Sequence, residues 1–325
     1  MRRGARAVAA LVAITLIAGC GGSAANTTTS ASTATTPPIP PGPPGIAVGR
    51  DPEALAAGFG EVWVANRGDG TVTRIDAASG RPVGRPIRVG LEPDAIAVAG
   101  RWVWVANYGD DTLTRIDGTS GTVDGPALKT GTAPAAVAAG AGSVWVANSG
   151  DETVTRYSAA TGRILDGAIY VGPYPDAIAV GGGSAWVANA GAGTVTQIDS
   201  ATGAVRRAAI RVGGAPSAIA VGAGAAWVAD DIGDRLTRLA LGSGAVLGAR
   251  VAVGHGPAAV AIGLGSVWVA NFDDHTVSRL GQRSGTARGR AILVGDEPTA
   301  LAIAAGSVWV ADYHGDDVNR IRVAG

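Results

Sequence analysis

The sequence predicts an all-β fold, a seven-bladed β-propeller with four-stranded blades. The first observation is a five-residue word, Val-Trp-Val-Ala-Asn or a close variant, that occurs seven times in the 325-residue chain. The second is the spacing, because the tryptophan of each copy follows the previous one by 41 residues without an insertion. A period of roughly 40 to 45 residues is typical of propeller blades. The seven tryptophans are Trp63, Trp104, Trp145, Trp186, Trp227, Trp268 and Trp309.

Each repeat contains four short extended runs separated by turn residues. In the first repeat these runs are residues 53–57, 61–66, 71–76 and 86–89. They carry Val, Ile, Thr and Trp, which favour strands, and Gly or Pro interrupts them too often for helices. The run that holds the tryptophan is apolar on both alternating faces, which indicates a strand covered by a neighbouring blade on each side.

The two ends of the repeat region predict how the ring closes. The outer run Ile87-Arg88-Val89-Gly90 has a counterpart 41 residues earlier, at Ile46-Ala47-Val48-Gly49. The seventh repeat contains only three runs before Gly325. We therefore expect residues 45–49 to supply the fourth strand of the last blade, so that this N-terminal strand closes the ring without an open edge.

A feature present in every repeat is most simply structural, because a single site does not need seven copies. A buried tryptophan removes about 150 to 250 Å² from water, roughly 4 to 6 kcal/mol as an upper bound, and is expected as a wedge between blades. The arginine of the third run, replaced once by Gln197, is expected to hydrogen bond between blades or to stack. The Asn or Asp that ends the tryptophan run is expected to begin an Asx-type turn.

Residues 1–19 predict an export signal. A basic start precedes an apolar stretch, Ala7 to Ala18, that is too short to span a bilayer. The segment Leu16-Ile17-Ala18-Gly19-Cys20 resembles a bacterial lipobox, which implies cleavage before Cys20 and lipidation of that residue. We therefore expect an extracytoplasmic lipoprotein, anchored by its N-terminal lipid in the outer leaflet of the cell membrane or in the outer membrane.

The composition divides the remaining chain into two parts. Residues 20–43 are rich in Ser, Thr, Ala, Gly and Pro, which cannot bury a core, and are expected to form a tether. Residues 44–325 hold the repeats and are expected to form the propeller. Cys20 is the only cysteine, so the chain has no internal disulfide and no cysteine-based metal cluster.

The acidic residues gather in two sets of loops. The full chain has 26 basic and 26 acidic residues, and loss of three arginines with the signal leaves 23 basic ones. Twenty of the acidic residues fall in or beside the loops that enter the innermost runs and the loops that join the second run to the third. In a propeller these loops share one face. An acidic face repels phosphates and suits a cationic ligand, peptide or protein, so nucleic acid binding is not expected.

Candidate site residues lie in the same loops. A histidine beside carboxylates can form a divalent metal site, for Mg²⁺ or Ca²⁺, or can act as a general base. Aromatic side chains among the acids, with Tyr174 at one loop, suit the rim of a ligand site. The metal candidates are His255, Asp273, Asp274, His275 and His314. The candidates for a ligand-binding face are Asp94, Tyr108, Asp110, Asp176, Asp231, Phe272, Asp296, Glu297 and Tyr313.

The repeats resemble those of YVTN-type β-propeller proteins, with Val-Trp-Val-Ala-Asn in place of Val-Tyr-Val-Thr-Asn, then Thr-Val-Thr-Arg-Ile-Asp and Ile-x-Val-Gly-x-x-Pro. They are also similar to repeats of the virginiamycin B lyase family, over residues 46–323. The first resemblance implies an extracytoplasmic propeller, with DNA binding reported for some members. The second implies a metal-assisted elimination that linearises a cyclic depsipeptide, using a histidine base and acidic metal ligands. No local motif matches those catalytic residues, so none is carried over.

Two functions therefore remain open. The first is a monomeric binding or scaffold module that acts through the acidic face. The second is a metal-dependent lyase or lactonase centred on the sixth and seventh blades, where the three histidines lie. The sequence contains no phosphate-binding loop, nucleophile elbow or zinc-binding helix motif, so it does not decide whether the chain is an enzyme.

Overall fold

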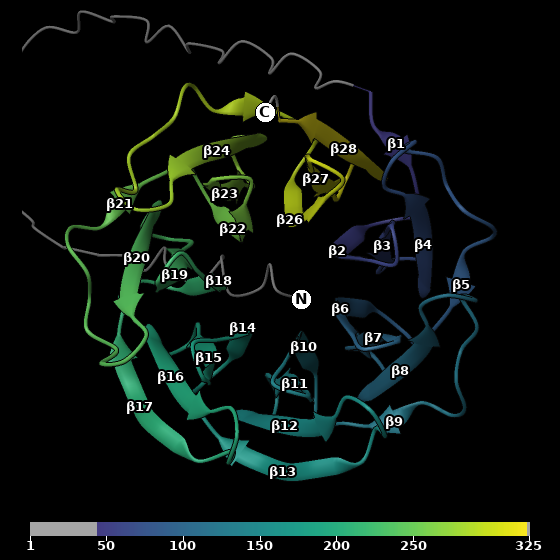
Figure 1. The fold of residues 1–325 in the computed structure, drawn as a ribbon, viewed down its shortest axis with the longest axis horizontal. Coiled ribbons are helices and arrows are strands. Elements are labelled where there is room, and N and C mark those ends of the chain that lie inside the picture. The colour runs from purple at the N-terminus through teal and green to yellow at the C-terminus, as the bar shows by residue number, and fades with distance from the viewer. Residues whose placement is uncertain (1–43, 324–325) are drawn as a thin grey trace, which may run out of the picture. The chain divides into compact units, whose positions relative to one another are not determined.

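The computed structural model describes residues 44–323, which form seven four-stranded antiparallel sheets (Figure 1). None of these residues is helical, and they include no helix long and apolar enough to cross a membrane. The inner strands of successive sheets contact one another in order, and the inner strand of the last sheet contacts that of the first. The prediction of an all-β, seven-bladed propeller is confirmed. The predicted signal, Cys20 and the tether lie outside the described residues.

Blades 1 to 6 are built from the centre outward in chain order, and blade 7 takes its outer strand from the N-terminal β1. Blade 1 is β2 (Pro52–Gly58), β3 (Glu61–Asn66), β4 (Thr71–Asp76) and β5 (Ile87–Arg88); blade 2 is β6 (Pro93–Ala99), β7 (Trp102–Asn107), β8 (Thr112–Asp117) and β9 (Leu128–Lys129). Blade 3 is β10 (Pro134–Gly140), β11 (Ser143–Asn148), β12 (Thr153–Ser158) and β13 (Ile164–Tyr170); blade 4 is β14 (Pro175–Gly181), β15 (Ser184–Asn189), β16 (Thr194–Asp199) and β17 (Val205–Arg211). Blade 5 is β18 (Pro216–Gly222), β19 (Ala225–Asp230), β20 (Arg235–Ala240) and β21 (Val251–Ala252); blade 6 is β22 (Pro257–Gly263), β23 (Ser266–Asn271), β24 (Thr276–Gly281) and β25 (Ile292–Leu293). Blade 7 is β26 (Pro298–Ala304), β27 (Ser307–Asp312), β28 (Asp317–Arg322) and β1 (Ile46–Ala47).

The outer strands depart most from the predicted pattern. The run expected at 86–89 shortens to the two residues of β5, whereas β13 and β17 extend over seven residues each. A glycine in the left-handed region accompanies the short outer strands of blades 1, 2, 5 and 6. Blade 1 has Gly84, with a φ of 69°, where β13 has Asp166 and β17 has Arg207. The equivalent glycines in blades 2, 5 and 6 are Gly125, Gly248 and Gly289.

The ring closes as the repeat arithmetic predicts. Strand β1 pairs antiparallel with β28, and Ile46 faces Val318 in the register. Two further hydrogen bonds fasten the junction, from the Val48 N–H to the Asp316 carbonyl at 3.0 Å and from the Asp51 N–H to the Asp316 carboxylate at 2.8 Å. The N-terminal strand therefore completes blade 7.

The repeated tryptophans are the wedges between blades. All seven are at most 1% exposed. Trp63 belongs to a cluster that also contains Val72 of its own blade and Ile96 and Val105 of blade 2. Each tryptophan thus buries its ring between two sheets, which is why the five-residue word recurs.

The third-strand arginines are structural, as expected. The arginine guanidinium lies 4.9 to 5.6 Å from the ring centroid of the tryptophan in its blade. The side chain also reaches the next blade, where the Arg156 Nη2 donates to the Ala201 carbonyl at 3.1 Å. Gln197 preserves this link, because its Nε2 donates to the Leu241 carbonyl at 2.9 Å.

The residue that ends the tryptophan strand does not begin an Asx turn in the blades that carry asparagine. Asn107 is fully buried, and its Nδ2 donates to the hydroxyls of Thr112 and Thr114 at 2.9 Å. Its Oδ1 accepts the N–H of Gly90 at 3.1 Å. The expectation is wrong because a buried amide must satisfy both its ends, and here it does so by linking two strands and a loop.

Candidate functional site

The loop face is formed by the seven loops that enter the inner strands and the seven loops that join second to third strands. In every blade the two loops hydrogen bond to each other through the backbone, as from the Tyr108 N–H to the Glu92 carbonyl at 2.9 Å. The entry loop turns with a positive φ at the accepting residue in six of these pairs, for example 48° at Glu92 and 50° at Tyr174. The backbone of the face is therefore a repeated scaffold on which the side chains vary.

One group of acidic residues holds this scaffold together within four of the seven blades. The carboxylates of Asp69, Asp110, Asp151 and Asp274 each accept the N–H of the residue nineteen positions earlier, at 2.6 to 2.8 Å. Hydrogen bonds from backbone N–H groups to an ionised carboxylate are strong, so these contacts fix the two loops of a blade relative to each other. Asp110 and Asp274, which the sequence assigns to a ligand face and a metal site, therefore have a structural role as well.

A second group joins four of the blades to the next blade, and the sequence reasoning missed it. Asp111, Asp234 and Asp316 each accept an N–H from the entry loop of the following blade, at 2.7 to 3.0 Å. His275 occupies the same position in blade 6, and its Nδ1 accepts the N–H of Glu297 at 3.0 Å. An alignment of the seven repeats would have revealed this equivalence.

The metal candidates separate into two places. The side chain of His255 is 71% exposed, and its Nδ1 lies 2.7 Å from the Asp234 carboxylate. The backbone N–H of His255 donates to the carboxylate of Asp274. The hydrogen bond with Asp234, followed by the charge of Asp274, raises the pKa of His255. Asp273 adjoins this loop, since a Cβ on Gly256 would approach its carboxylate at 2.5 Å.

The other two histidines meet at the junction of blades 6 and 7. The Nδ1 of His275 lies 3.1 Å from the Asp296 carboxylate, and the Nδ1 of His314 lies 3.1 Å from Glu297 and 3.9 Å from Asp296. The Tyr313 ring is 5.4 Å from that of His314. Across residues 44–323, no group of three or more His, Cys, Asp or Glu side chains could hold a metal ion.

A cationic side chain is already bound at the joint between blades 1 and 2. Arg67, from the β3–β4 loop, donates to Asp94 at 2.5 Å and to Glu92, and its guanidinium lies 5.3 Å from the Tyr108 ring centroid. The Asp94 side chain is fully buried, and that of Arg67 is 10% exposed. Burial alone would lower the pKa of Arg67, but the charges of Asp94 and Glu53 and the contacts with Glu92 raise it.

The remaining face candidates differ in exposure. Asp176 begins the inner strand of blade 4 directly after Pro175 and is partly exposed. Phe272 is 9% exposed and lies within the fold rather than on a rim, whereas Tyr174 is 67% exposed. The N–H of Asp231 donates to the Ala215 carbonyl at 3.0 Å.

Blade 7 contains a buried acidic pair that the sequence reasoning also missed. Asp312 stands where five blades have asparagine, and Asp317 stands where those blades have threonine. The Nδ2 of Asn319 donates to Asp312 at 2.8 Å and to Asp317 at 3.3 Å. Burial, together with Asp317, raises the pKa of Asp312 to about 8. Blade 5 also has an aspartate here, Asp230, but the side chain of Arg235 pairs with it at 3.1 Å.

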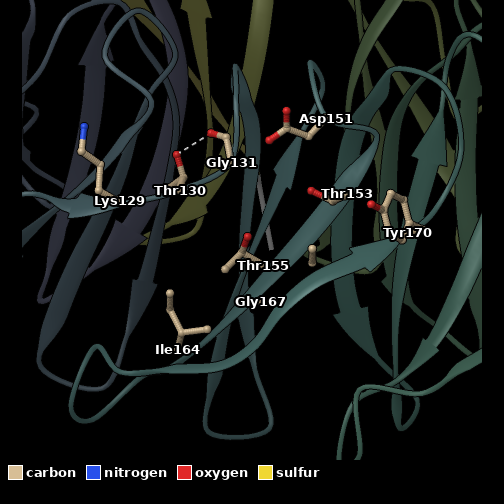
Figure 2. A pocket seen from close by; sticks show the side chains of 10 residues that line it. Lys129, Thr130, Gly131, Asp151, Thr153, Thr155, Ile164, Gly167 and Tyr170 are labelled. Carbon is tan, nitrogen blue, oxygen red and sulfur yellow. Dashed lines mark hydrogen bonds between the residues drawn. The ribbon is translucent and has the colours of Figure 1, made fainter.

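The two grooves that we describe lie along the outer strands and reach the edge of the loop face. One, of about 420 Å³, is lined by Lys129, Asp151, Ile164 and Tyr170 among others (Figure 2). The other, of about 490 Å³, is its counterpart one blade earlier, and Lys129 lines both. Their threonine walls already bind the buried asparagines, as at Thr153 and Thr155. The grooves thus follow from the repeat.

Solved structures support the fold. A streptogramin B lyase structure aligns with a TM-score of 0.73 and 17% identity, over 86% of this chain and 95% of that one. A catalytically inactive virginiamycin B lyase from Staphylococcus aureus with quinupristin aligns with a TM-score of 0.73 and 16% identity, over 86% and 99%. The chain is a β-propeller similar in fold to virginiamycin B lyase. Kuenenia stuttgartiensis hydrazine synthase aligns equally well, at 0.73 and 17%, over 84% and 96%, so the fold alone selects no activity. No protein-family profile and no curated protein matches the sequence.

Proposed function

We propose that this chain is a binding module of the cell envelope whose loop face takes a cationic ligand, peptide or protein. The observation that carries the proposal is the setting of Arg67, where two carboxylates and an aromatic ring hold a guanidinium on this face. Carboxylates that accept N–H groups, together with an aromatic ring that stacks on the cation, commonly recognise guanidinium and ammonium groups. The same face that binds one internal cation is suited to bind an external one.

The pattern of variation among the repeats supports the same proposal. The five-residue segment around the tryptophan recurs, unchanged or as a close variant, in all seven blades. The residue that directly follows this segment differs in nearly every blade. These residues are Arg67, Tyr108, Ser149, Ala190, Asp231, Phe272 and Tyr313. A scaffold whose core is uniform and whose loop face is irregular is the arrangement expected of a binding surface, because recognition needs distinct side chains on rigid supports.

The test is a calorimetric titration of the purified protein with short peptide amides of opposite charge. A tri-arginine amide is expected to bind and to weaken as salt rises, because exposed charge pairs are screened. A tri-glutamate of the same length is the matched control and is expected not to bind. Equal binding of both peptides, or binding of the acidic one alone, would overturn the proposal.

The envelope location rests on residues 1–43. Export, lipidation of Cys20 and a Ser/Thr/Pro-rich tether are parts of the proposal that follow from the sequence alone. They predict incorporation of labelled fatty acid into the wild type and release of Cys20→Ser protein from the membrane fraction. Labelling that persists in Cys20→Ser would place the lipid elsewhere.

A lyase or lactonase activity is the second candidate, supported by the fold similarity and by the histidines at the junction of blades 6 and 7. The described residues do not offer three ligands to a metal, so we derive no metal step. His275 is a poor base, because its Nδ1 accepts the Glu297 N–H and its neutral ring then carries the proton on Nε2. His314 is the better base, since Glu297 at 3.1 Å suits a proton on its Nδ1 and leaves Nε2 as the acceptor nitrogen.

The assay for this candidate is linearisation of quinupristin, followed by mass spectrometry with and without a chelator. His314→Gly is the informative variant, because blades 1 to 4 carry glycine at this position and the turn should survive. Activity that disappears in His314→Gly would establish the lyase. No conversion by the wild type would exclude this substrate.

A further inference from the structure

Six exposed arginines lie on three neighbouring blades, outside the loops of the loop face. Blade 7 stands between the other two blades, because its inner strand β26 contacts both β22 of blade 6 and β2 of blade 1. Among residues 44–323, none of the six guanidinium groups forms an ion pair. We call this set the basic sector: Arg81 and Arg85 of blade 1, Arg283, Arg288 and Arg290 of blade 6, and Arg322 of blade 7.

The acids around the basic sector are few, and those present are already bound. Blade 6 has no Asp or Glu from residue 276 to residue 294, and blade 7 has none from 318 to 323. Blade 1 has two acids in this region, and each is hydrogen bonded within the blade: Glu61 with Arg74 and Asp76 with Ser79. Blades 2 and 4, in contrast, pair arginines of the same region with acids: Arg101 with Asp117 and Arg206 with Asp199. The described residues therefore leave the charge of the basic sector unneutralised.

The repeat itself does not require these arginines. Arg322 stands at the position of the aspartate that ends the third strand in blades 1, 2 and 4. Arg290 stands where blades 4 and 5 have alanine, and Arg283 stands where blades 1, 3 and 4 have alanine. The third-strand arginines recur because they stack on the buried tryptophans, but packing between blades does not explain the basic sector.

The N-terminal segment, residues 1–43, joins the propeller inside this sector. It leads directly to β1, which pairs with β28 of blade 7. On one side, the β4–β5 turn of blade 1 lies against β1, since a Cβ on Gly80 would approach the Ile46 Cδ1 at 3.5 Å. On the other side, Ile321 of β28 packs in one cluster with Ile292 of blade 6. Arginines of the sector thus flank the point of attachment, where Figure 1 shows β24, β28, β1 and β5 in order around the ring.

We propose that the basic sector docks on a membrane surface that contains anionic phospholipids. Guanidinium groups bind phosphate oxygens in a bidentate manner, and a cluster of arginines beside a membrane anchor is attracted to anionic headgroups. A lipid chain and a basic patch together hold a protein more stably than one chain alone. The inference rests on the envelope location in the proposed function and adds a docking surface to it. Docking in this way leaves the loop face accessible, because the basic sector lies outside its loops.

The test is co-sedimentation with lipid vesicles of the full-length chain carrying Cys20→Ser, which has no site for the lipid. Vesicles of phosphatidylglycerol and phosphatidylcholine are expected to bind the protein at least tenfold more tightly than vesicles of phosphatidylcholine alone. Added salt should weaken the binding, because exposed charges are screened. Equal binding to both kinds of vesicle would overturn the proposal.

The decisive variant removes one arginine of the sector from each blade, and a matched control removes the same charge elsewhere. The variant combines Arg81→Gln, Arg290→Gln and Arg322→Gln, and it should weaken binding to the anionic vesicles at least tenfold. The control changes three exposed arginines of blades 3, 4 and 5 that form no ion pair within residues 44–323, and it should weaken binding less than threefold. It combines Arg163→Gln, Arg211→Gln and Arg250→Gln. All these proteins share residues 1–43, so any contribution of that segment cancels.

The outcomes separate this inference from the proposed function. Equal losses in the variant and its control, or an unchanged affinity in the variant, would overturn the docking surface and leave the loop-face proposal standing. Tri-arginine binding should be the same in the variant and the wild type, and labelling of Cys20 tests the envelope location separately. Should the triple variant fail to fold, as judged by its thermal transition, Arg290→Ala carries the test. This variant installs the residue of blades 4 and 5 and should weaken vesicle binding several-fold.

Discussion

Replacing Asp312 by asparagine should stabilise the protein at neutral pH. The substitution restores the residue found in five other blades and removes a carboxyl group from a site that is fully buried. In the wild type this group faces Asp317 and the amide of Asn319 on β28, and Gly295 on the preceding loop. No cation is among the causes that shift the pKa of Asp312 or Asp317.

The size of the effect follows from proton linkage. The pKa of Asp312 is about 8 in the folded protein and about 4 in an unfolded chain, so the folded state binds one more proton between these values. The free energy of unfolding then falls by about 1.4 kcal/mol for each pH unit from about pH 4 to about pH 8. The stability that protonated Asp312 contributes is complete below pH 4 and is lost as the pH rises through 8. Between pH 5 and pH 7 the free energy of unfolding of the wild type should fall by about 3 kcal/mol because of Asp312.

The assay is urea unfolding at pH 5, 6, 7 and 8, followed by the fluorescence of the buried tryptophans. The difference between Asp312→Asn and the wild type cancels the titration of groups that do not interact with Asp312, and reports the coupled pair of Asp312 and Asp317. This difference should grow with pH in favour of the variant. Asp230→Asn is the matched control in blade 5 and should lower stability, because it leaves Arg235 without its carboxylate partner. A difference that stays constant from pH 5 to 8 would refute the reasoning.

Three further predictions concern the loops and the closure. His275→Asp should change the free energy of unfolding by less than about 0.5 kcal/mol, while His275→Ala should lower it by about 1 to 2 kcal/mol, because only aspartate keeps an acceptor for the Glu297 N–H. Gly45→Ala should speed hydrogen exchange in β28, since a Cβ there would overlap the Asp317 carboxylate; unchanged exchange would contradict this. Asp234→Asn should return the His255 pKa toward its ordinary value in an NMR titration, because the hydrogen bond with Asp234 is the main cause of its rise.

The fold was predictable because the same apolar pattern recurs in every repeat and requires the same packing between blades. The bounds expected for the second and third strands of blade 1 agree with β3 and β4 residue for residue. Both strands are buried between blades, so their apolar pattern is strict. The outer strands were not predictable to the same degree, since they are exposed and their length varies with single residues such as Gly84.

The site was predictable only in outline. The strands on either side of these loops were predicted closely, but a count of acids could not separate those available to a ligand from those that hold loops. That distinction depends on hydrogen bonds between residues 19 or 22 positions apart, such as Asp110 with Leu91 and Asp111 with Ala133. Charge sorting places Arg67 and Arg50 among the acids, but it could not show that Arg67 binds Asp94 and Glu92.

A residue that differs from its equivalents in the other blades can be interpreted only together with the residues that it contacts. Blades 5 and 7 both exchange the buried asparagine for aspartate. In blade 5 the exchange comes with Arg235, and the new charge is compensated. In blade 7 it comes with Asp317, so the pair must retain a proton or tolerate repulsion in the blade that closes the ring.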